Sequence, residues 1–148
     1  MIIFLLGFMG AGKTTIGRDL ANSMNFKFID LDEYIEKKEN STVFDIFNKK
    51  GEKHFRQLEH YSLKELILLN NIVIATGGGT PCFFDNHNFM KSIGNTIYLK
   101  VSSEELYKRL QKTNNRPLLF NNKLNLNQFI QDNLLSRVSC YSESDFTL

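Results

Sequence analysis

Short apolar runs alternate with longer amphipathic stretches along this chain. These short runs are rich in β-branched and other apolar residues, and they occupy residues 2–6, 27–30, 72–75 and 96–99. Runs of this kind are typical of strands buried on both faces of a parallel sheet. Apolar residues at helical spacing fill the intervals between them. The pattern therefore predicts an α/β fold with a parallel sheet.

Helical periodicity and turn residues place the remaining elements. Ile16, Leu20 and Met24 mark a helix after the first strand, and Ser41 or Thr42 is suited to cap a later one. A helix is predicted over residues 33–39, and another runs from the cap at Ser41 or Thr42 to a break at Gly51. A longer helix follows the break and ends at about residue 69. Two more are predicted over residues 103–111 and 126–141. Residues 145–148 are expected to begin one more strand, and no element is predicted for the aromatic segment 80–90.

Length and composition describe an ordinary globular protein. With 148 residues, of which 42% are hydrophobic and 23% charged, a single domain over residues 1–148 is expected. A net charge of +2 gives no reason to expect nucleic acid or membrane partners, and no apolar run approaches the ~20 residues of a transmembrane helix. Cys82 and Cys140 lie far apart without C-x-x-C spacing, so we expect reduced thiols in a cytoplasmic protein.

A glycine-rich stretch, Gly7–Thr14, lies between the first strand and the helix after it. Its sequence GFMGAGKT fits the pattern G-x-x-x-x-G-K-[ST]. Glycines let the backbone wrap a phosphate, and the loop amides converge beside the positive N-terminus of the helix. Lys13 supplies a positive charge for the β and γ phosphates, and the Thr14 hydroxyl can ligate Mg²⁺. The stretch therefore predicts a nucleoside triphosphate site.

Two further groups of residues follow predicted strands. Asp30 and Asp32 come at the end of the second strand, where ligands of open α/β sheets bind. These acids could hold Mg²⁺ through water and deprotonate an attacking hydroxyl, or they could cap the next helix. Gly77-Gly78-Gly79 follows the third strand; it indicates close backbone contact with a small substrate, or else a flexible loop.

Three arginines stand out, although their spacing leaves their roles open. Arg56 and Arg137 lie among apolar residues of amphipathic helices, where each could bind a carboxylate or phosphate or form a surface salt bridge. Arg116 precedes a proline in a polar, asparagine-rich segment at about 112–123, which we interpret as a short mobile lid. It could close over the phosphates or stay solvated.

Taken together, the motifs resemble those of the shikimate kinase family. The phosphate loop and Phe28-Ile29-Asp30-Leu31-Asp32 resemble the start of these enzymes. The other matches are Gly51-Glu52 with Phe55-Arg56 and Glu59, then Ala75-Thr76-Gly77-Gly78-Gly79, Arg116-Pro117-Leu118-Leu119, and Arg137 four residues before Tyr141. They occur in the order of the family from residue 1 to about 145. Six motifs in sequence are a specific signal.

The resemblance implies a three-layer P-loop NTPase fold of the nucleoside monophosphate kinase type, with helices on both faces of a five-stranded parallel sheet. It implies transfer of the ATP γ-phosphoryl group to the 3-hydroxyl of shikimate, with Mg²⁺ held by Thr14 directly and by Asp30 through water. Lys13, Asp32 and Arg116 are the expected catalytic residues, with Asp32 as the base. ATP is expected at Gly10, Ala11, Gly12, Lys13, Thr14, Thr15, Arg109 and Arg116, with Arg109 against adenine. Shikimate is expected at Asp32, Arg56, Gly77, Gly78, Gly79 and Arg137.

The resemblance also marks a departure and leaves alternatives. Family members continue through a last strand, an adenine-contacting loop and a C-terminal helix, so the C-terminal strand and helix are expected to be truncated here. Part of the adenine pocket is then expected to be absent, which bears on ATP affinity and stability. The alternatives are a gluconate kinase-like small-molecule kinase and a nucleotide-binding module with impaired catalysis. A monomer is expected.

Overall fold

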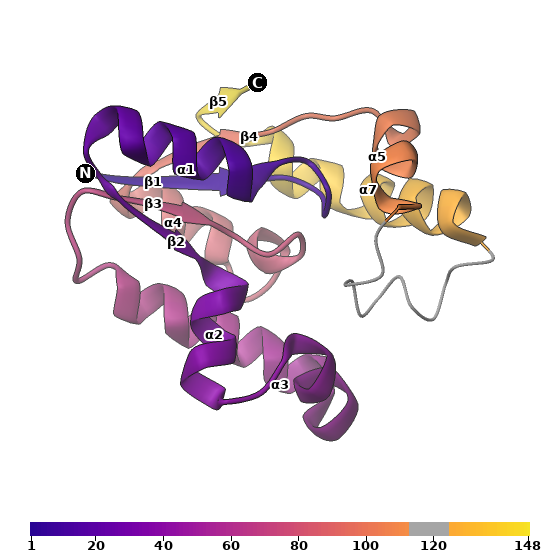
Figure 1. The fold of residues 1–148 in the computed structure, drawn as a ribbon, viewed down its shortest axis with the longest axis horizontal. Coiled ribbons are helices and arrows are strands. Elements are labelled where there is room, and N and C mark those ends of the chain that lie inside the picture. The colour runs from indigo at the N-terminus through magenta and orange to yellow at the C-terminus, as the bar shows by residue number, and fades with distance from the viewer. Residues whose placement is uncertain (113–124) are drawn as a thin grey trace.

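A five-stranded, all-parallel sheet organises the computed structural model, which describes residues 1–112 and 125–148 (Figure 1). Its strand order is β2-β3-β1-β4-β5. The strands are β1 (Ile2–Leu6), β2 (Lys27–Asp30), β3 (Ile72–Ala75), β4 (Asn95–Tyr98) and β5 (Phe146–Thr147). The predicted parallel sheet is confirmed, and the strand expected to begin at residues 145–148 is its edge strand β5.

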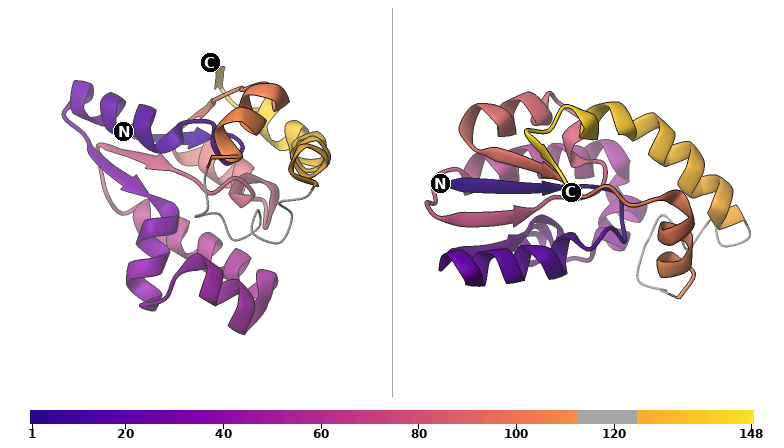
Figure 2. Two further views of the ribbon diagram at one scale, coloured as in Figure 1. Left: turned by 45° about the vertical axis from the view of Figure 1, so that its right-hand side comes forward. Right: turned by 90° about the horizontal axis from the view of Figure 1, so that it is seen from above.

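Alternation along the central strand builds a core on both faces of the sheet. Ile2, Phe4 and Leu6 pack on the face covered by α3 (Val43–Leu66), α4 (Asn86–Ile93) and α7 (Leu126–Ser142). Ile3 and Leu5 pack on the other face, against α1 (Lys13–Met24). Figure 2 shows, in its right panel, the sheet between α1 and the α4 and α7 helices. The three-layer arrangement follows from this period of two.

Side-chain caps start three of the helices. Asp30 accepts hydrogen bonds from the amides of Asp32 and Glu33 at the start of α2 (Leu31–Glu39). The Thr42 hydroxyl caps α3, and the Ser102 hydroxyl caps α5 (Ser103–Leu110). Gly51 interrupts α3 with a non-helical φ of 83°, so the predicted break is a kink after which the helix resumes.

The aromatic segment after β3 contains two elements that the sequence did not predict. A short 3₁₀ turn, η1 (Thr80–Cys82), is followed by α4. The start of α4 is hard to recognise because Asp85 precedes it with a φ of 57° and provides no side-chain cap. The buried Asn86 side chain instead donates to the Thr80 carbonyl oxygen at 2.9 Å. Tertiary packing therefore fixes this turn, not a local cap.

The prediction of reduced cysteines was wrong. Cys82 in η1 and Cys140 in α7 form a disulfide, with their Cα atoms 5.5 Å apart and a sequence separation of 58. Sequence spacing could not reveal this pair, because the two residues meet only once α7 folds back against η1. Within residues 1–112 and 125–148, no helix is both long and apolar enough to cross a membrane. The proposed lid and Arg116 lie outside the described residues, except for Lys112.

Candidate active site

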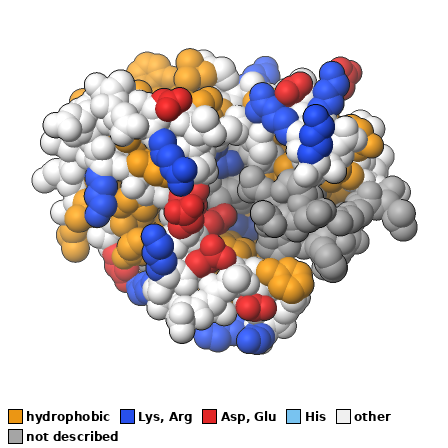
Figure 3. Space-filling view, in the orientation of Figure 1, with side chains coloured by type: hydrophobic (Ala, Val, Ile, Leu, Met, Phe, Trp, Pro, Cys, Tyr) orange, Lys and Arg blue, Asp and Glu red, His pale blue; other side chains and the backbone are white. Residues whose placement is uncertain are grey.

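A cavity of about 320 Å³ opens beyond the carboxyl ends of the central strands. The sheet register pairs Leu5 with Ala75 and Ala75 with Asp30, so β1, β3 and β2 end at one level. The loops that leave these three strands therefore surround the same space, as expected for an open α/β sheet. Figure 3 shows acidic side chains gathered near the centre of the face on which this space opens.

The phosphate loop forms one end of the cavity. Gly10 and Gly12 adopt φ values of 82° and 96°, which favour glycine, and the loop leads directly into α1. Lys13 Nζ lies 2.7 Å from the Gly7 carbonyl oxygen and 2.9 Å from that of Phe8. The ammonium is thus folded back over the loop, beside the helix N-terminus that would face an anion.

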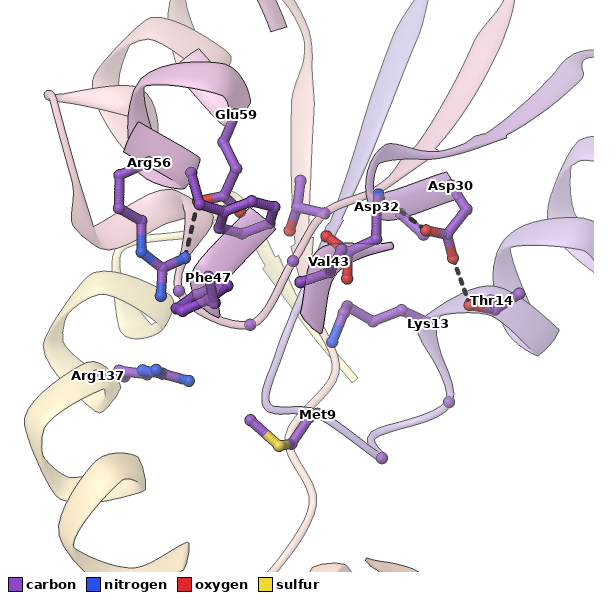
Figure 4. A pocket seen from close by; sticks show the side chains of 18 of the residues that line it. Met9, Lys13, Thr14, Asp30, Asp32, Val43, Phe47, Arg56, Glu59 and Arg137 are labelled. Carbon is purple, nitrogen blue, oxygen red and sulfur yellow. Dashed lines mark hydrogen bonds and ion pairs between the residues drawn. The ribbon is translucent and has the colours of Figure 1, made fainter. Parts of the chain in front are cut away.

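Asp30 takes the capping role that the sequence left open, and it also contacts the phosphate loop. Its Oδ1 accepts the capping amides of α2, while its Oδ2 accepts a 2.8 Å hydrogen bond from the Thr14 hydroxyl. The Thr14 and Asp30 oxygens therefore lie together at the phosphate end (Figure 4). Asp32, in the first turn of α2, projects into the cavity between this pair and the arginines.

Two buried arginines form the opposite end. Arg56 from α3 and Arg137 from α7 are only 4% and 8% exposed, and both point into the cavity (Figure 4). Neither is therefore a surface arginine, which removes that interpretation. Arg137 Nη1 is buried and has no hydrogen-bond partner among the described residues. A buried donor without a partner lowers the stability of the folded protein, and an anionic ligand that accepts its hydrogen bond would remove this cost.

Glu59 anchors Arg56 from the lining of the cavity. It is fully buried, its Oε1 accepts a 2.7 Å hydrogen bond from Arg56 Nη1, and its Oε2 accepts one from the Thr80 hydroxyl. Burial raises the pKa of the Glu59 carboxyl, although Arg56 and the Thr80 hydroxyl act in the opposite direction. The sequence indicated Glu59 only as part of the family motif, because its spacing from neighbouring residues does not predict that the carboxylate is buried.

The triple glycine leaves room for the buried charged side chains around it. A Cβ at Gly79 would lie 2.6 Å from Arg56 Nη2, and one at Gly78 would lie 3.3 Å from Arg137 Nη1. A Cβ at Gly77 would lie 2.7 Å from the carboxylate of Glu59. A side chain at Gly79 would thus displace the Arg56 guanidinium, and one at Gly77 would displace the Glu59 carboxylate that holds it.

Tyr141 ties the same loop to α7. Its fully buried ring stacks on Tyr98 with centroids 5.0 Å apart, and its hydroxyl donates to the Gly78 carbonyl oxygen. Burial raises the pKa of Tyr141 to about 12, although nearby Arg137 acts in the opposite direction. The phenol therefore stays protonated and able to donate near neutral pH.

Most of the residues predicted for the site line this one cavity: Gly10, Gly12, Lys13, Thr14, Thr15, Asp30, Asp32, Arg56, Gly77, Gly78, Gly79 and Arg137. Ala11 does not, because its side chain packs into a hydrophobic cluster beneath the loop. Arg109 lies beside the loop instead, with Nη1 3.1 Å from the Gly10 carbonyl oxygen and Nε 3.0 Å from Glu105.

Sequence reasoning missed the apolar part of the lining. Met9, Val43, Phe47, Phe55 and Ala75 also contact the cavity. Val43 and Phe47 stand four residues apart at the start of α3, so their shared face was a usable signal. Phe55 adjoins Arg56 and was visible only as part of the motif.

Comparison with known proteins agrees with this geometry. The sequence model of the family described as shikimate kinase matches residues 9–148. A shikimate kinase of Parabacteroides distasonis is 46% identical over 98% of this chain and 85% of its own length. The crystal structure of the Bacteroides thetaiotaomicron shikimate kinase has a TM-score of 0.95 at 42% identity, covering 100% of this chain and 85% of that one. The Acinetobacter baumannii shikimate kinase in complex with shikimate has a TM-score of 0.94 at 40% identity, over 99% and 82% of the two chains. This chain belongs to the shikimate kinase family.

Proposed function

We propose that this chain transfers the γ-phosphoryl group of ATP to the 3-hydroxyl of shikimate. The observation that carries the proposal is the pair of buried arginines, Arg56 and Arg137, facing a phosphate loop across one cavity. Shikimate is a carboxylate with ring hydroxyls, so it would present its anionic group to the arginines and a hydroxyl toward ATP. A volume of about 320 Å³ is at the small end of ligand pockets and suits a metabolite of this size.

The nucleotide end would act through positioned charge. Backbone amides of the loop and Lys13 would bind the β and γ phosphates, where they stabilise the charge that develops as the phosphoryl group leaves. The Thr14 hydroxyl and the Asp30 carboxylate give an all-oxygen donor pair, which fits Mg²⁺ with water and phosphate oxygens as its other ligands. When bound, Mg²⁺ would neutralise part of the phosphate charge. We propose that Thr14 holds it directly and Asp30 through water.

The substrate end would orient the acceptor. Arg56 and Arg137 each offer a planar fork that binds a carboxylate through two hydrogen bonds. The triple glycine would lie beside the shikimate ring, because its lack of side chains leaves the approach open. Asp32, between the two ends of the cavity, would contact the 3-hydroxyl and accept its proton during attack on the phosphoryl group.

The remaining assignments complete this proposal. Arg116 would close over ATP from the segment 112–123. Arg109 would lie against adenine, and its position beside Gly10 and Gly12 of the phosphate loop supports this assignment. We expect residues 1–148 to act as a single domain, in a monomer and in the cytoplasm. Size-exclusion chromatography with light scattering would test the monomer.

The test is ADP release from purified protein with Mg-ATP, measured with shikimate, with gluconate and with neither. Release that depends on shikimate alone is the expected result. Release with gluconate but not shikimate would replace the substrate with that of a related kinase. ATP binding without release on either acid would identify an impaired nucleotide-binding module.

A further inference from the structure

One aromatic side chain after the triple glycine has a position that neither the core nor the cavity explains. Phe83 follows η1, is 36% exposed, and belongs to none of the hydrophobic clusters of the described residues. It is also not among the described residues that line the cavity. Its ring instead contacts Arg56, whose Cζ lies 4.4 Å from the ring centroid. The contact with Arg56 is therefore what this position provides.

Two carboxylates already hold the edges of the Arg56 guanidinium. Nη1 donates to Glu59 at 2.7 Å, while Nε and Nη2 reach Glu52 Oε1 at 3.4 and 3.2 Å. Arginine has five N–H donors, so three are used and two remain, one on each terminal nitrogen. Each of these two N–H groups remains able to donate to an incoming carboxylate.

Hydrogen bonds along the edges leave the tilt of the guanidinium plane weakly fixed. An aromatic face close to the cation supplies the missing contact, and cation–π attraction grows when the cation is removed from water, as Arg56 is at 4% exposure. Phe55 is a weaker partner, since its ring centroid lies 5.6 Å from Arg56 Cζ. Phe83 is thus the nearer of the two rings against the guanidinium.

The backbone beside Phe83 is itself anchored. The neighbouring Cys82 is bonded to Cys140 in α7, three residues after Arg137. The backbone next to Phe83 is therefore linked covalently to the same helix that carries the second arginine of the cavity. Gly79 leaves the space that the guanidinium occupies, because a Cβ there would lie 2.6 Å from Nη2.

We propose that Phe83 is a positioning residue for substrate binding. Its ring face holds the Arg56 guanidinium in the orientation that directs the two remaining N–H groups at the shikimate carboxylate. The inference rests on the proposed function, because it requires a carboxylate on Arg56. It predicts a role for the π face of residue 83 and not merely for its apolar bulk.

The experiment compares Phe83→Leu, which keeps apolar bulk without a π face, with Phe83→Tyr, which keeps both. We expect Phe83→Leu to raise KM for shikimate about three- to tenfold, the range of one partly exposed cation–π contact, with KM for ATP unchanged. Phe83→Tyr should stay within about twofold of wild type. Phe84→Leu is the matched control, because Phe84 is 49% exposed and its ring lies near His60 instead of Arg56.

A double-mutant cycle with Arg56→Ala separates positioning from general damage. Phe83→Leu should have no further effect on shikimate KM once Arg56 is absent. The inference is overturned if Phe83→Leu is neutral while Arg56→Ala is not, if Phe83→Tyr is as impaired as Phe83→Leu, or if Phe84→Leu matches them. Failure of the proposed function would look different, because wild-type protein would then release no ADP with shikimate and would bind no shikimate in calorimetry.

Discussion

The two ends of the cavity are built in different ways. The proposed nucleotide end comes from one contiguous stretch, Gly7–Thr15, with Asp30 added from the next strand. The substrate end is assembled from α3, the loop after β3 and α7, which supply Arg56, the triple glycine and Arg137. The nucleotide end is therefore formed by residues close together in sequence, whereas the substrate end requires tertiary packing of segments far apart in sequence.

This difference separates two kinds of fragility. A change in the phosphate loop should alter catalysis while leaving the fold intact, because strand β1 and helix α1 hold the loop on either side. The substrate end depends on buried charge, on Glu59 and on links between η1 and α7. Changes there should affect shikimate binding and stability together, and leave ATP binding largely unaltered.

The largest effect is expected from Lys13→Ala. Removing the ammonium takes away charge stabilisation of the transferring phosphoryl group, so kcat should fall by about 10²–10³-fold, as for loss of one preorganised electrostatic donor. The measurement is steady-state ADP release at saturating shikimate, with Lys64→Ala, an exposed lysine of α3, as control. Full activity of Lys13→Ala would remove this loop from the catalytic site.

The disulfide tests how far the substrate end depends on tertiary links. Replacing Cys82 and Cys140 by Ser should lower the free energy of unfolding by about 2–4 kcal/mol, the usual contribution of a bridge that closes a loop of this size. Urea unfolding with and without a dithiol reductant measures it, and the variant should not respond to the reductant. Oxidised wild-type protein that is equally stable after reduction would contradict the prediction.

Arg137→Ala should act on one substrate only. Loss of a charge-assisted hydrogen-bonding partner costs about 1.5–3 kcal/mol, so KM for shikimate should rise by roughly 10- to 150-fold. KM for ATP should change little, because the arginine lies at the other end of the cavity (Figure 4). Arg18→Ala, which removes an arginine that is 57% exposed and paired with Glu33 at 3.7 Å, provides the control. Equal weakening of both substrates would argue against an arginine clamp on the carboxylate.

The same contrast explains what could be predicted from the sequence. The phosphate loop and the buried strands could be predicted because their signals are contiguous: glycine, lysine and threonine at fixed spacing, and unbroken apolar runs. Burial of Arg56 could not be predicted from spacing, since it depends on Glu59 and on the room left at Gly79. The family motifs identified both residues without giving this reason.

Two misses have a common cause. The disulfide and helix α4 depend on contacts between segments far apart in sequence, or on a turn without a side-chain cap. Cys82 and Cys140 carry no local signal of pairing, and Asp85 gives none of capping. Where tertiary packing fixes a feature, periodicity and spacing give no access to it.

The smallest effect at neutral pH is expected from Tyr141→Phe, which removes one hydrogen bond to the Gly78 carbonyl oxygen. The cost should be about 1 kcal/mol of unfolding free energy, the usual net value of such a bond.

The pH dependence of this stability difference tests the ionisation of the phenol itself. The folded pKa of about 12 lies above the usual value of 10, so the contribution of the ionisable phenol is complete below pH 10 and is lost as pH rises toward 12. The advantage of wild-type protein over Tyr141→Phe should therefore shrink by on the order of 1 kcal/mol between neutral pH and pH 11. Urea unfolding across this range, with the 58% exposed Tyr61 changed to Phe as control, measures the difference. A constant gap would mean that burial does not raise the pKa of the Tyr141 phenol in the folded protein.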